Sequence, residues 1–99
     1  MRITIEEDET AMELKLEGRV AGPWAAELSR VWVEEFPRLA SRKLSLDLRS
    51  VTYADADGTR TLREIYSRTR AELVTGTPWT QFLAEQIAQT GANPDDEEL

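Results

Sequence analysis

The stretch that decides the fold is LSLDLRSVTYADADGTRTLREIY, residues 44–66. Its first part alternates apolar and polar residues from Leu44 to Leu48, which is typical of a strand with one buried face. Its last part repeats apolar residues at helical spacing from Leu62 to Tyr66. The segment DADG, residues 55–58, lies between them. The stretch therefore predicts a strand that passes through a short acidic loop into a helix.

The residues on the N-terminal side predict a β-hairpin followed by a helix. Apolar residues alternate with polar ones in residues 1–6 and 12–17, with an acidic turn between them, which indicates two strands. Pro23 follows a glycine and suits the first position of a helix. We expect this helix to end near Phe36, or to loosen into a last turn that carries Leu39, because Pro37 disfavours a helix interior. The predicted inner stripe consists of Trp24, Leu28, Val31, Trp32 and Phe36.

The residues on the C-terminal side predict the rest of the second helix, a short strand and a third helix. The inner stripe of the second helix consists of Leu62, Ile65, Tyr66, Thr69 and Leu73. A strand around residues 72–75 follows, and Thr77 and Pro78 then suit the cap and first position of a helix. The inner stripe of that helix consists of Trp79, Phe82, Leu83, Gln86 and Ile87.

The predicted order of elements is ββαβαβα. Helices between consecutive strands favour parallel pairing, whereas the opening hairpin is antiparallel. We therefore predict an α/β fold, with a mixed four-stranded sheet and helices packed against it. One domain is expected to cover residues 1–91, and the acidic residues 92–99 are expected to form a disordered tail.

The composition argues against several classes of function. A length of 99 residues suits one domain, and a net charge of −7 opposes binding to nucleic acid. The chain has no histidine and no cysteine, so the commonest general base, the commonest transition-metal ligand and thiolate chemistry are all lacking. We predict no enzyme activity, no cofactor and no metal site. The lack of an export signal and of a long apolar run favours a cytoplasmic protein without direct membrane insertion.

Two blocks of sequence resemble a known family. The first block, GRVAGPWAAEL at residues 18–28, has the family's leading glycine and its later alanine and leucine at Ala25 and Leu28. The second block, LDLRSVTYADADG at residues 46–58, is similar to an apolar strand with an aspartate, followed by an Asp-Ser-Ser-Gly motif. Both blocks resemble the STAS domains of bacterial anti-sigma-factor antagonists. The resemblance covers nearly the whole body of the chain and implies a STAS-like fold and a regulatory, protein-binding role.

The chain departs from the family pattern at positions that matter for regulation. The resemblance implies that an anti-sigma-factor kinase modifies the first serine of Asp-Ser-Ser-Gly, and Ala56 occupies that position here. Ala21 occupies the position of the family's aspartate in the first block. Alanine offers no hydroxyl, so we expect no phospho-acceptor at Ala56. Thr59 and Thr61 are the alternative phospho-acceptors, although hydroxyls near a helix start more often make local hydrogen bonds.

Asp55 and Asp57 admit more than one interpretation. They suit a junction between strand and helix because carboxylates cap exposed amides and complement the helix dipole. Two adjacent carboxylates are also the minimum for a metal site or for the acid–base pair of a carboxylate-based hydrolase. Asp57 is in addition a candidate mimic of phosphoserine. We favour the capping role, because no histidine or third ligand accompanies the pair.

We predict that a partner protein binds at this junction and on the helix that follows. The helix carries four arginines on an acidic protein, which indicates either a solvated face or a docking surface. These arginines are Arg60, Arg63, Arg68 and Arg70. The three tryptophans fall on predicted inner stripes, so we expect Trp24, Trp32 and Trp79 in the core rather than around a ligand. The predicted partner-binding residues are Asp55, Ala56, Asp57, Gly58, Thr59, Arg60 and Arg63.

The leading functional prediction is a non-catalytic regulatory module that binds another protein and resembles an anti-sigma-factor antagonist. The resemblance implies three kinds of partner: an anti-sigma factor, a sensor linked to a kinase, or a transporter ATPase. One alternative is a STAS-type scaffold subunit of a transporter or sensor complex, and another is the carboxylate-based hydrolase. The sequence assigns no oligomeric state.

Overall fold

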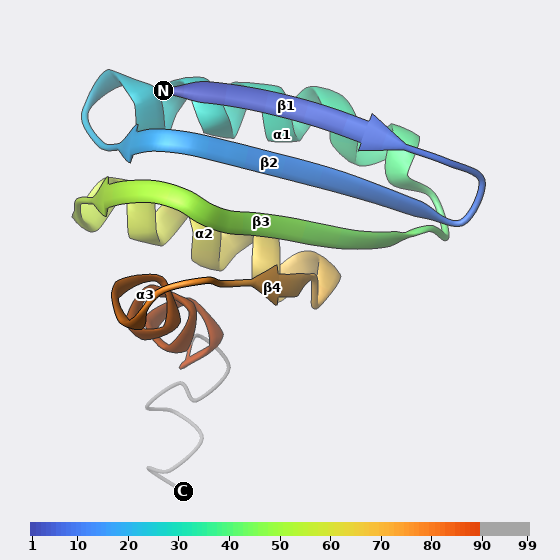
Figure 1. Ribbon diagram of the computed structural model, residues 1–99. Coiled ribbons are helices and arrows are strands. Elements are labelled where there is room, and N and C mark those ends of the chain that lie inside the picture. Colours follow the sequence, from blue (N-terminus) through green and yellow to red (C-terminus); the bar gives the residue numbers. More distant parts are fainter. Residues whose placement is uncertain (90–99) are drawn as a thin grey trace, which may run out of the picture.

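The computed structural model describes residues 1–89 and contains one mixed four-stranded sheet with three helices (Figure 1). The element order ββαβαβα and the α/β class are those predicted from the sequence. The predicted tail, residues 92–99, lies outside the described residues. The elements are β1 (Arg2–Glu7), β2 (Ala11–Val20), α1 (Pro23–Leu39), β3 (Lys43–Ala54), α2 (Ala56–Thr69), β4 (Glu72–Val74) and α3 (Pro78–Ala88).

The strands follow one another across the sheet in the order β1-β2-β3-β4. β1 pairs antiparallel with β2, whereas β2 with β3 and β3 with β4 pair in parallel. In Figure 1, α1 and α2 lie behind the sheet, and α3 lies beyond β3 near β4. The pair of β2 with β3 joins the two longest strands, and each of these strands is followed by one of the two longer helices.

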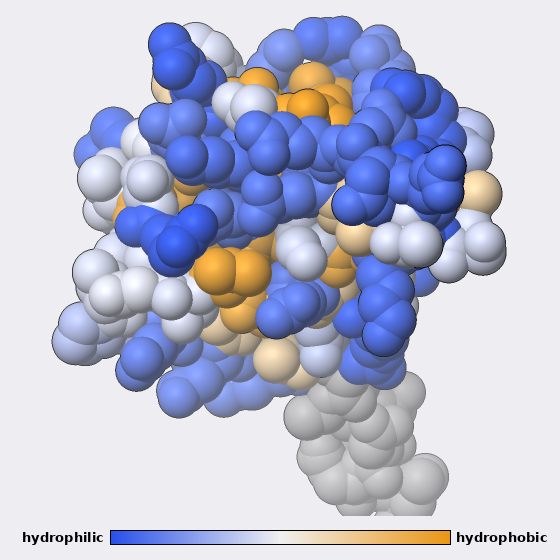
Figure 2. All heavy atoms as spheres, turned by 45° about the vertical axis from the view of Figure 1, so that its right-hand side comes forward, coloured by the Kyte–Doolittle hydropathy of each residue, from blue (hydrophilic) through white to orange (hydrophobic). Residues whose placement is uncertain are grey.

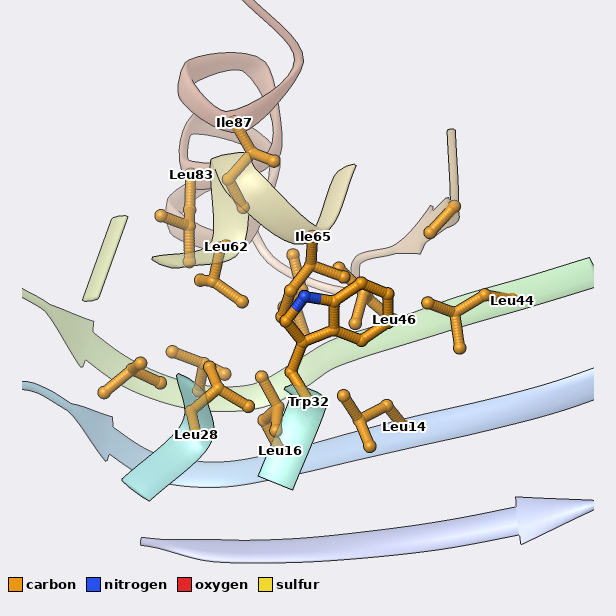
Figure 3. Packing of buried hydrophobic residues seen from close by; sticks show 14 of the residues in the cluster. Leu14, Leu16, Leu28, Trp32, Leu44, Leu46, Leu62, Ile65, Leu83 and Ile87 are labelled. Atoms are coloured by element: carbon orange, nitrogen blue, oxygen red, sulfur yellow. The ribbon is translucent and has the colours of Figure 1, made fainter. Parts of the chain in front are cut away.

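The hydrophobic core lies between the sheet and the helices (Figure 3). Alternation along β2 and β3 turns every second residue towards the helices, and Leu14 and Leu46 are paired across these strands and buried. Trp32 of α1 lies among these leucines and beside Ile65 of α2. α3 completes the core with two further apolar residues, Leu83 and Ile87.

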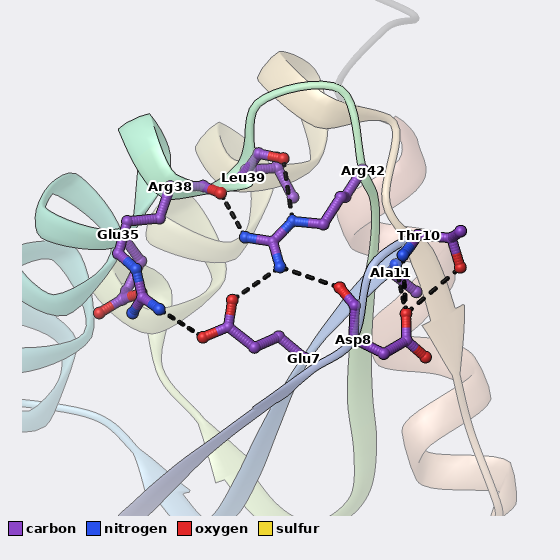
Figure 4. Close-up of polar contacts among 8 residues, drawn as sticks. All are labelled: Glu7, Asp8, Thr10, Ala11, Glu35, Arg38, Leu39 and Arg42. Atoms are coloured by element: carbon purple, nitrogen blue, oxygen red, sulfur yellow. Dashed lines mark hydrogen bonds and ion pairs between the residues drawn. The ribbon is translucent and has the colours of Figure 1, made fainter.

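The turn of the opening hairpin is fastened to the end of α1 by charged groups (Figure 4). Arg42 Nη1 donates to Glu7 Oε1 at 2.7 Å and to the carbonyl of Asp8 at 3.0 Å, and Arg38 also pairs with Glu7. The hydrogen bond from Arg42 holds the pKa of Glu7 below its ordinary value, and the positive charge of Arg38 acts in the same direction.

The face of the molecule drawn in Figure 2 is mainly hydrophilic, and its apolar residues form small separate patches.

Three aromatic residues assigned to inner stripes are in fact exposed. Trp24, Phe36 and Phe82 have relative exposures of 46%, 41% and 53%. Spacing gives the direction of a stripe but not the width of the surface that covers it. Phe36 packs on the edge of the Trp32 ring, with centroids 4.8 Å apart. Phe82 lies 6.3 Å from the ring of Trp79.

The end of α1 matches the second of the two ends predicted from the sequence. α1 continues through Pro37 to Leu39, because a proline in the last turn removes only one hydrogen bond and Leu39 is buried in the core. Two other element boundaries differ from the sequence prediction. α2 begins at Ala56, so most of the predicted loop at residues 55–58 is the first helical turn. Leu73 belongs to β4, not to α2. Among the described residues, no helix is long and apolar enough to cross a membrane.

The start of α2 is held by Asp55, which is its N-cap residue. Asp55 Oδ1 accepts from the amide of Gly58 at 2.7 Å, and Oδ2 accepts from the amide of Gly22, before α1, at 2.9 Å. The amides of Gly58 and Gly22 hold the pKa of Asp55 below its ordinary value. The predicted capping role of this carboxylate is confirmed, and it reaches both helix starts.

Gly58 allows α2 to begin directly against the end of β2. A β-carbon built on Gly58 would lie 1.9 Å from the carbonyl oxygen of Val20, and 2.9 Å from its carbonyl carbon. The obstacle is backbone that belongs to the sheet, so it cannot swing aside as a long side chain would. Only glycine fits this contact.

The substitution Gly58→Ala should lower the free energy of unfolding by ~3 kcal/mol, because the added methyl group has to displace the β2 backbone. The matched control is Gly76→Ala, where φ is not positive and the added carbon would meet only the flexible side chain of Arg49, at 3.1 Å. That variant should change the free energy of unfolding by less than about 1 kcal/mol. Urea denaturation measures both, and equal losses would contradict the close approach at Gly58.

The substitution Asp55→Asn should lower the melting temperature by a few degrees near neutral pH. Asparagine can still accept from one amide, but its NH2 group cannot replace the oxygen that serves the other. The pKa of Asp55 is lowered in the fold. The stability that its carboxylate adds is therefore fully present above the unfolded-state pKa, and it is lost as the pH falls through the lower pKa of the folded state. The difference between the two proteins should therefore shrink below about pH 4. Asp57→Asn is the control, and an equal effect there would contradict the account.

Candidate functional site

The candidate site is built at the carboxyl ends of β2 and β3, which lie side by side because the strands are parallel. Val20 is paired with Ala54 at the end of this ladder, and the amide of Asp55 donates to the carbonyl of Val20 at 3.3 Å. α1 starts just after β2 and α2 just after β3. The parallel topology therefore brings two helix starts together at one end of the sheet.

Side chains from both helices form one shallow surface at this end, here called the α2-start surface. It surrounds a hollow of about 270 Å³. α2 contributes Asp57, Arg60 and Thr61, and α1 contributes small residues that leave the surface open. Those residues are Ala25, Ala26 and Ser29, with Gly22 just before the helix. Ala56 is exposed at the first position of α2 and belongs to the same junction.

The structure brings part of the predicted partner-binding set to the surface. Ala56, Asp57 and Arg60 are exposed. Asp55 and Thr59 are half-buried, and both oxygens of the Asp55 carboxylate already accept amide hydrogen bonds.

Gly58 is buried against β2, so it offers little surface for a direct partner contact. Its role in the site is indirect, because it sets how closely α2 approaches the sheet. The expected exposed loop was wrong here: a glycine next to acidic residues is typical of a loop, whereas Gly58 lies inside the first turn of a helix.

The predicted free exposure of Arg63 is also wrong. Arg63 is half-buried, and its Nε donates to the carbonyl of Gln86 in α3 at 3.0 Å. The position faces α3, a contact that spacing along α2 alone does not reveal. Arg63 thus fastens α3 to α2, and replacing it would disturb the fold before it could report on binding.

The charges on the α2-start surface are balanced. Asp57 Oδ1 pairs with Arg60 Nη1 at 2.9 Å, and the two side chains are 61% and 71% exposed. An exposed pair of this kind contributes little to stability. Both groups can therefore exchange partners with an incoming protein at small cost.

The two hydroxyl groups considered as phospho-acceptors lie in the first turns of α2. Thr61 is half-buried, and its Oγ1 donates to the carbonyl of Asp57 at 3.0 Å. This is the local helical bond that unmodified threonines often make. Thr59 is half-buried as well.

The carboxylates of Asp55 and Asp57 make different interactions. Asp55 is occupied by two amides, and Asp57 pairs with Arg60. Within residues 1–89, no group of three or more acidic residues is placed to hold a metal ion.

The buried Asp47 lies away from this end of the sheet. Its carboxylate accepts hydrogen bonds from Arg49, through the backbone amide at 3.1 Å and through the guanidinium at 3.0 and 2.9 Å. The hydrogen bonds from Arg49 lower the pKa of Asp47.

The tryptophans do not line this surface. Trp32 is in the core as predicted, and half-buried Trp79 packs against the core and donates from its Nε1 to the carbonyl of Val51 at 3.2 Å. Trp24 is exposed and lies beside β1 instead.

Sequence reasoning missed the contribution of α1 to the site, because Ala25, Ala26 and Ser29 carry no chemical signal. Recognising that parallel strands bring α1 beside α2 is the step that could have found them.

Comparisons with known proteins support the fold. No family model and no curated protein sequence matches the chain. One similar solved structure, from a crystal structure analysis of Mglu, has a TM-score of 0.60 and 20% identity, and covers 76% of this chain and 19% of that chain. The chain thus corresponds to about a fifth of that longer protein. The anti-sigma factor antagonist SpoIIAA in its unphosphorylated form has a TM-score of 0.58 and 10% identity, and covers 85% of this chain and 82% of that chain.

Identities this low bear on the fold and not on the activity. The match to SpoIIAA extends over most of both chains, and it agrees with the element order and with the mixed sheet. The chain therefore has a STAS-like α/β fold, as its two sequence blocks predicted.

Proposed function

We propose that the chain is a non-catalytic regulatory module that binds a partner protein through the α2-start surface. The observation that carries the proposal is the exposure of Ala56, Asp57 and Arg60 at one helix start, beside a hollow floored by small residues of α1. A shallow surface with exchangeable charges suits a protein partner better than a small substrate, which needs an enclosing pocket. The STAS-like fold supports the same reading by analogy.

The proposed partner is one of the three kinds that the sequence resemblance implies: an anti-sigma factor, a kinase-linked sensor or a transporter ATPase. The alternative, a scaffold subunit of a transporter or sensor complex, uses the same surface and differs in the partner. Signalling, control of transcription and a cytoplasmic location in bacteria belong to this proposal. Co-purification of the native partner, followed by its identification, distinguishes these cases.

The proposed regulation lacks a phosphorylation switch at the usual position. Phosphate transfer needs a hydroxyl acceptor, and Ala56 has only a methyl group. The hydroxyl of Thr61 is engaged with the backbone of its own helix. The module is therefore proposed to stay in a permanently binding-competent form, with affinity and abundance setting the output.

The substitution Arg60→Glu should weaken binding of the co-purified partner by about tenfold or more, because it reverses the one positive charge that lines the hollow. The stability of the variant should change by less than ~0.5 kcal/mol, since Arg60 is exposed. Arg68→Glu is the matched control, because Arg68 lies two turns further along α2 and is also exposed. Calorimetric titration measures the affinities. Unchanged binding by Arg60→Glu, or an equal loss in both variants, would move the interface away from the helix start.

The complex of the wild-type chain with its partner should persist when ATP and Mg²⁺ are added. The same experiment with Ala56→Ser tests whether the surface is still recognised by a kinase, because that variant restores the hydroxyl. Native mass spectrometry follows both release and phosphate incorporation. Release of the wild-type chain with phosphate on Thr59 or Thr61 would contradict the proposal and establish a relocated switch.

A further inference from the structure

β1 is an edge strand with an unpaired outer side. Within residues 1–89, β1 hydrogen-bonds only to β2, and the sheet ends there. Folded proteins commonly protect such an edge with charges, bulges or a covering segment, because its free amides and carbonyls can pair with another chain. β1 has no bulge in its register with β2, and it remains regular over six residues.

A hollow lined by both apolar and acidic residues lies beside this edge, between β1 and α1. Its volume is about 360 Å³, and its apolar lining includes Ile3, Ile5 and Trp24. Trp24 is 46% exposed, and both isoleucines are only half-buried. The exposure of Trp24 is the one that helical spacing did not predict. The hollow and the free edge together form a surface that no other part of residues 1–89 covers.

The sequence of β1 is complementary to itself in one antiparallel register. If Thr4 lies opposite Thr4 of a second copy, Arg2 lies opposite Glu6 and Ile3 lies opposite Ile5. Each charge then meets its opposite, and each isoleucine meets an isoleucine on the helix side of the sheet. Directly opposed residues of antiparallel strands interact most strongly. Shifting the register by two residues in either direction places a charged side chain opposite Thr4 instead.

We propose that two copies of this chain associate through β1, so that their sheets join into one sheet of eight strands. A two-fold axis at Thr4 makes the interface isologous, and therefore each complementary pair occurs twice. On the helix side, the hollow of each copy is covered by the Ile3, Ile5 and Trp24 of the other. Three glutamates also line the hollow, and each already pairs with an arginine of its own copy. Arg30 pairs with Glu27 at 2.5 Å and with Glu34 at 3.1 Å, and Arg38 pairs with Glu35 at 2.9 Å.

This interface is independent of the proposed partner-binding function. The hollow beside β1 and the α2-start surface share no lining residue. Dimerisation therefore leaves Asp57 and Arg60 of both copies free, and a dimer would present two partner-binding surfaces.

Sedimentation equilibrium of the full chain over a series of concentrations tests the dimer. The wild-type chain should fit a monomer–dimer equilibrium. Arg2→Glu alone and Glu6→Arg alone should each raise the dimer dissociation constant about tenfold, because each places like charges opposite one another twice. The double swap, Arg2→Glu with Glu6→Arg, should restore dimerisation to near the wild-type level. Melting temperatures serve as the control for folding, since these residues also lie opposite Glu17 and Glu13 of β2.

A wild-type chain that stays monomeric at every concentration would overturn the proposal, as would a double swap that fails to restore the dimer. If Arg2 and Glu6 interacted only within their own copy, the double swap would not be expected to restore dimerisation.

A cysteine cross-link tests the register itself. The chain has no cysteine, so Thr4→Cys introduces a single thiol on the two-fold axis, where opposed β-carbons come close to disulfide distance. Mild oxidation should convert this variant to a covalent dimer at least tenfold faster than Thr52→Cys, an exposed control position on β3. Equal rates for the two variants would overturn the proposed register.

Discussion

One carboxylate couples the starts of α1 and α2. Asp55 accepts from the amide of Gly58 in its own helix and from the amide of Gly22 before the other helix, at 2.7 and 2.9 Å. The two elements are far apart in sequence, so this contact fixes a long-range relation that neither helix could establish alone. Gly58 adds the second constraint, because its lack of a side chain lets α2 begin against Val20. The α2-start surface exists only while both constraints hold.

The sequence predicted the architecture well, because alternation along the strands and three- to four-residue spacing in the helices are local properties. It predicted the cap at Asp55 for the same reason. It did not predict that Gly58 is buried or that Arg63 reaches the carbonyl of Gln86. Those facts depend on where β2 and α3 pass, which is decided by packing between distant segments. The exposed Trp24 shows a further limit, since spacing gives the direction of a stripe but not what covers it.

In the first turn of α2, the residues that stabilise the fold differ from the residues proposed to bind the partner. Asp55 and Gly58 hold the turn in place, while Asp57 and Arg60 point outward with a weak, exchangeable ion pair. With Ala56 at the first position of α2, the turn offers no hydroxyl where the related motif has one. The proposed module therefore binds through this surface without a phospho-acceptor at that position. Pairing of two chains through β1 would then raise the number of surfaces without changing any of them.

The most direct test of the coupling is an NMR titration of the backbone amides of Gly22 and Gly58 through the acid range in which the protein stays folded. Because both amides donate to the same carboxylate, their proton shifts should move together, with one midpoint below the ordinary aspartate value of 3.8. In Asp55→Asn, this shared transition should disappear from both amides at once. Separate midpoints for the two amides, or a transition that survives the substitution, would contradict the claim that Asp55 holds both helix starts.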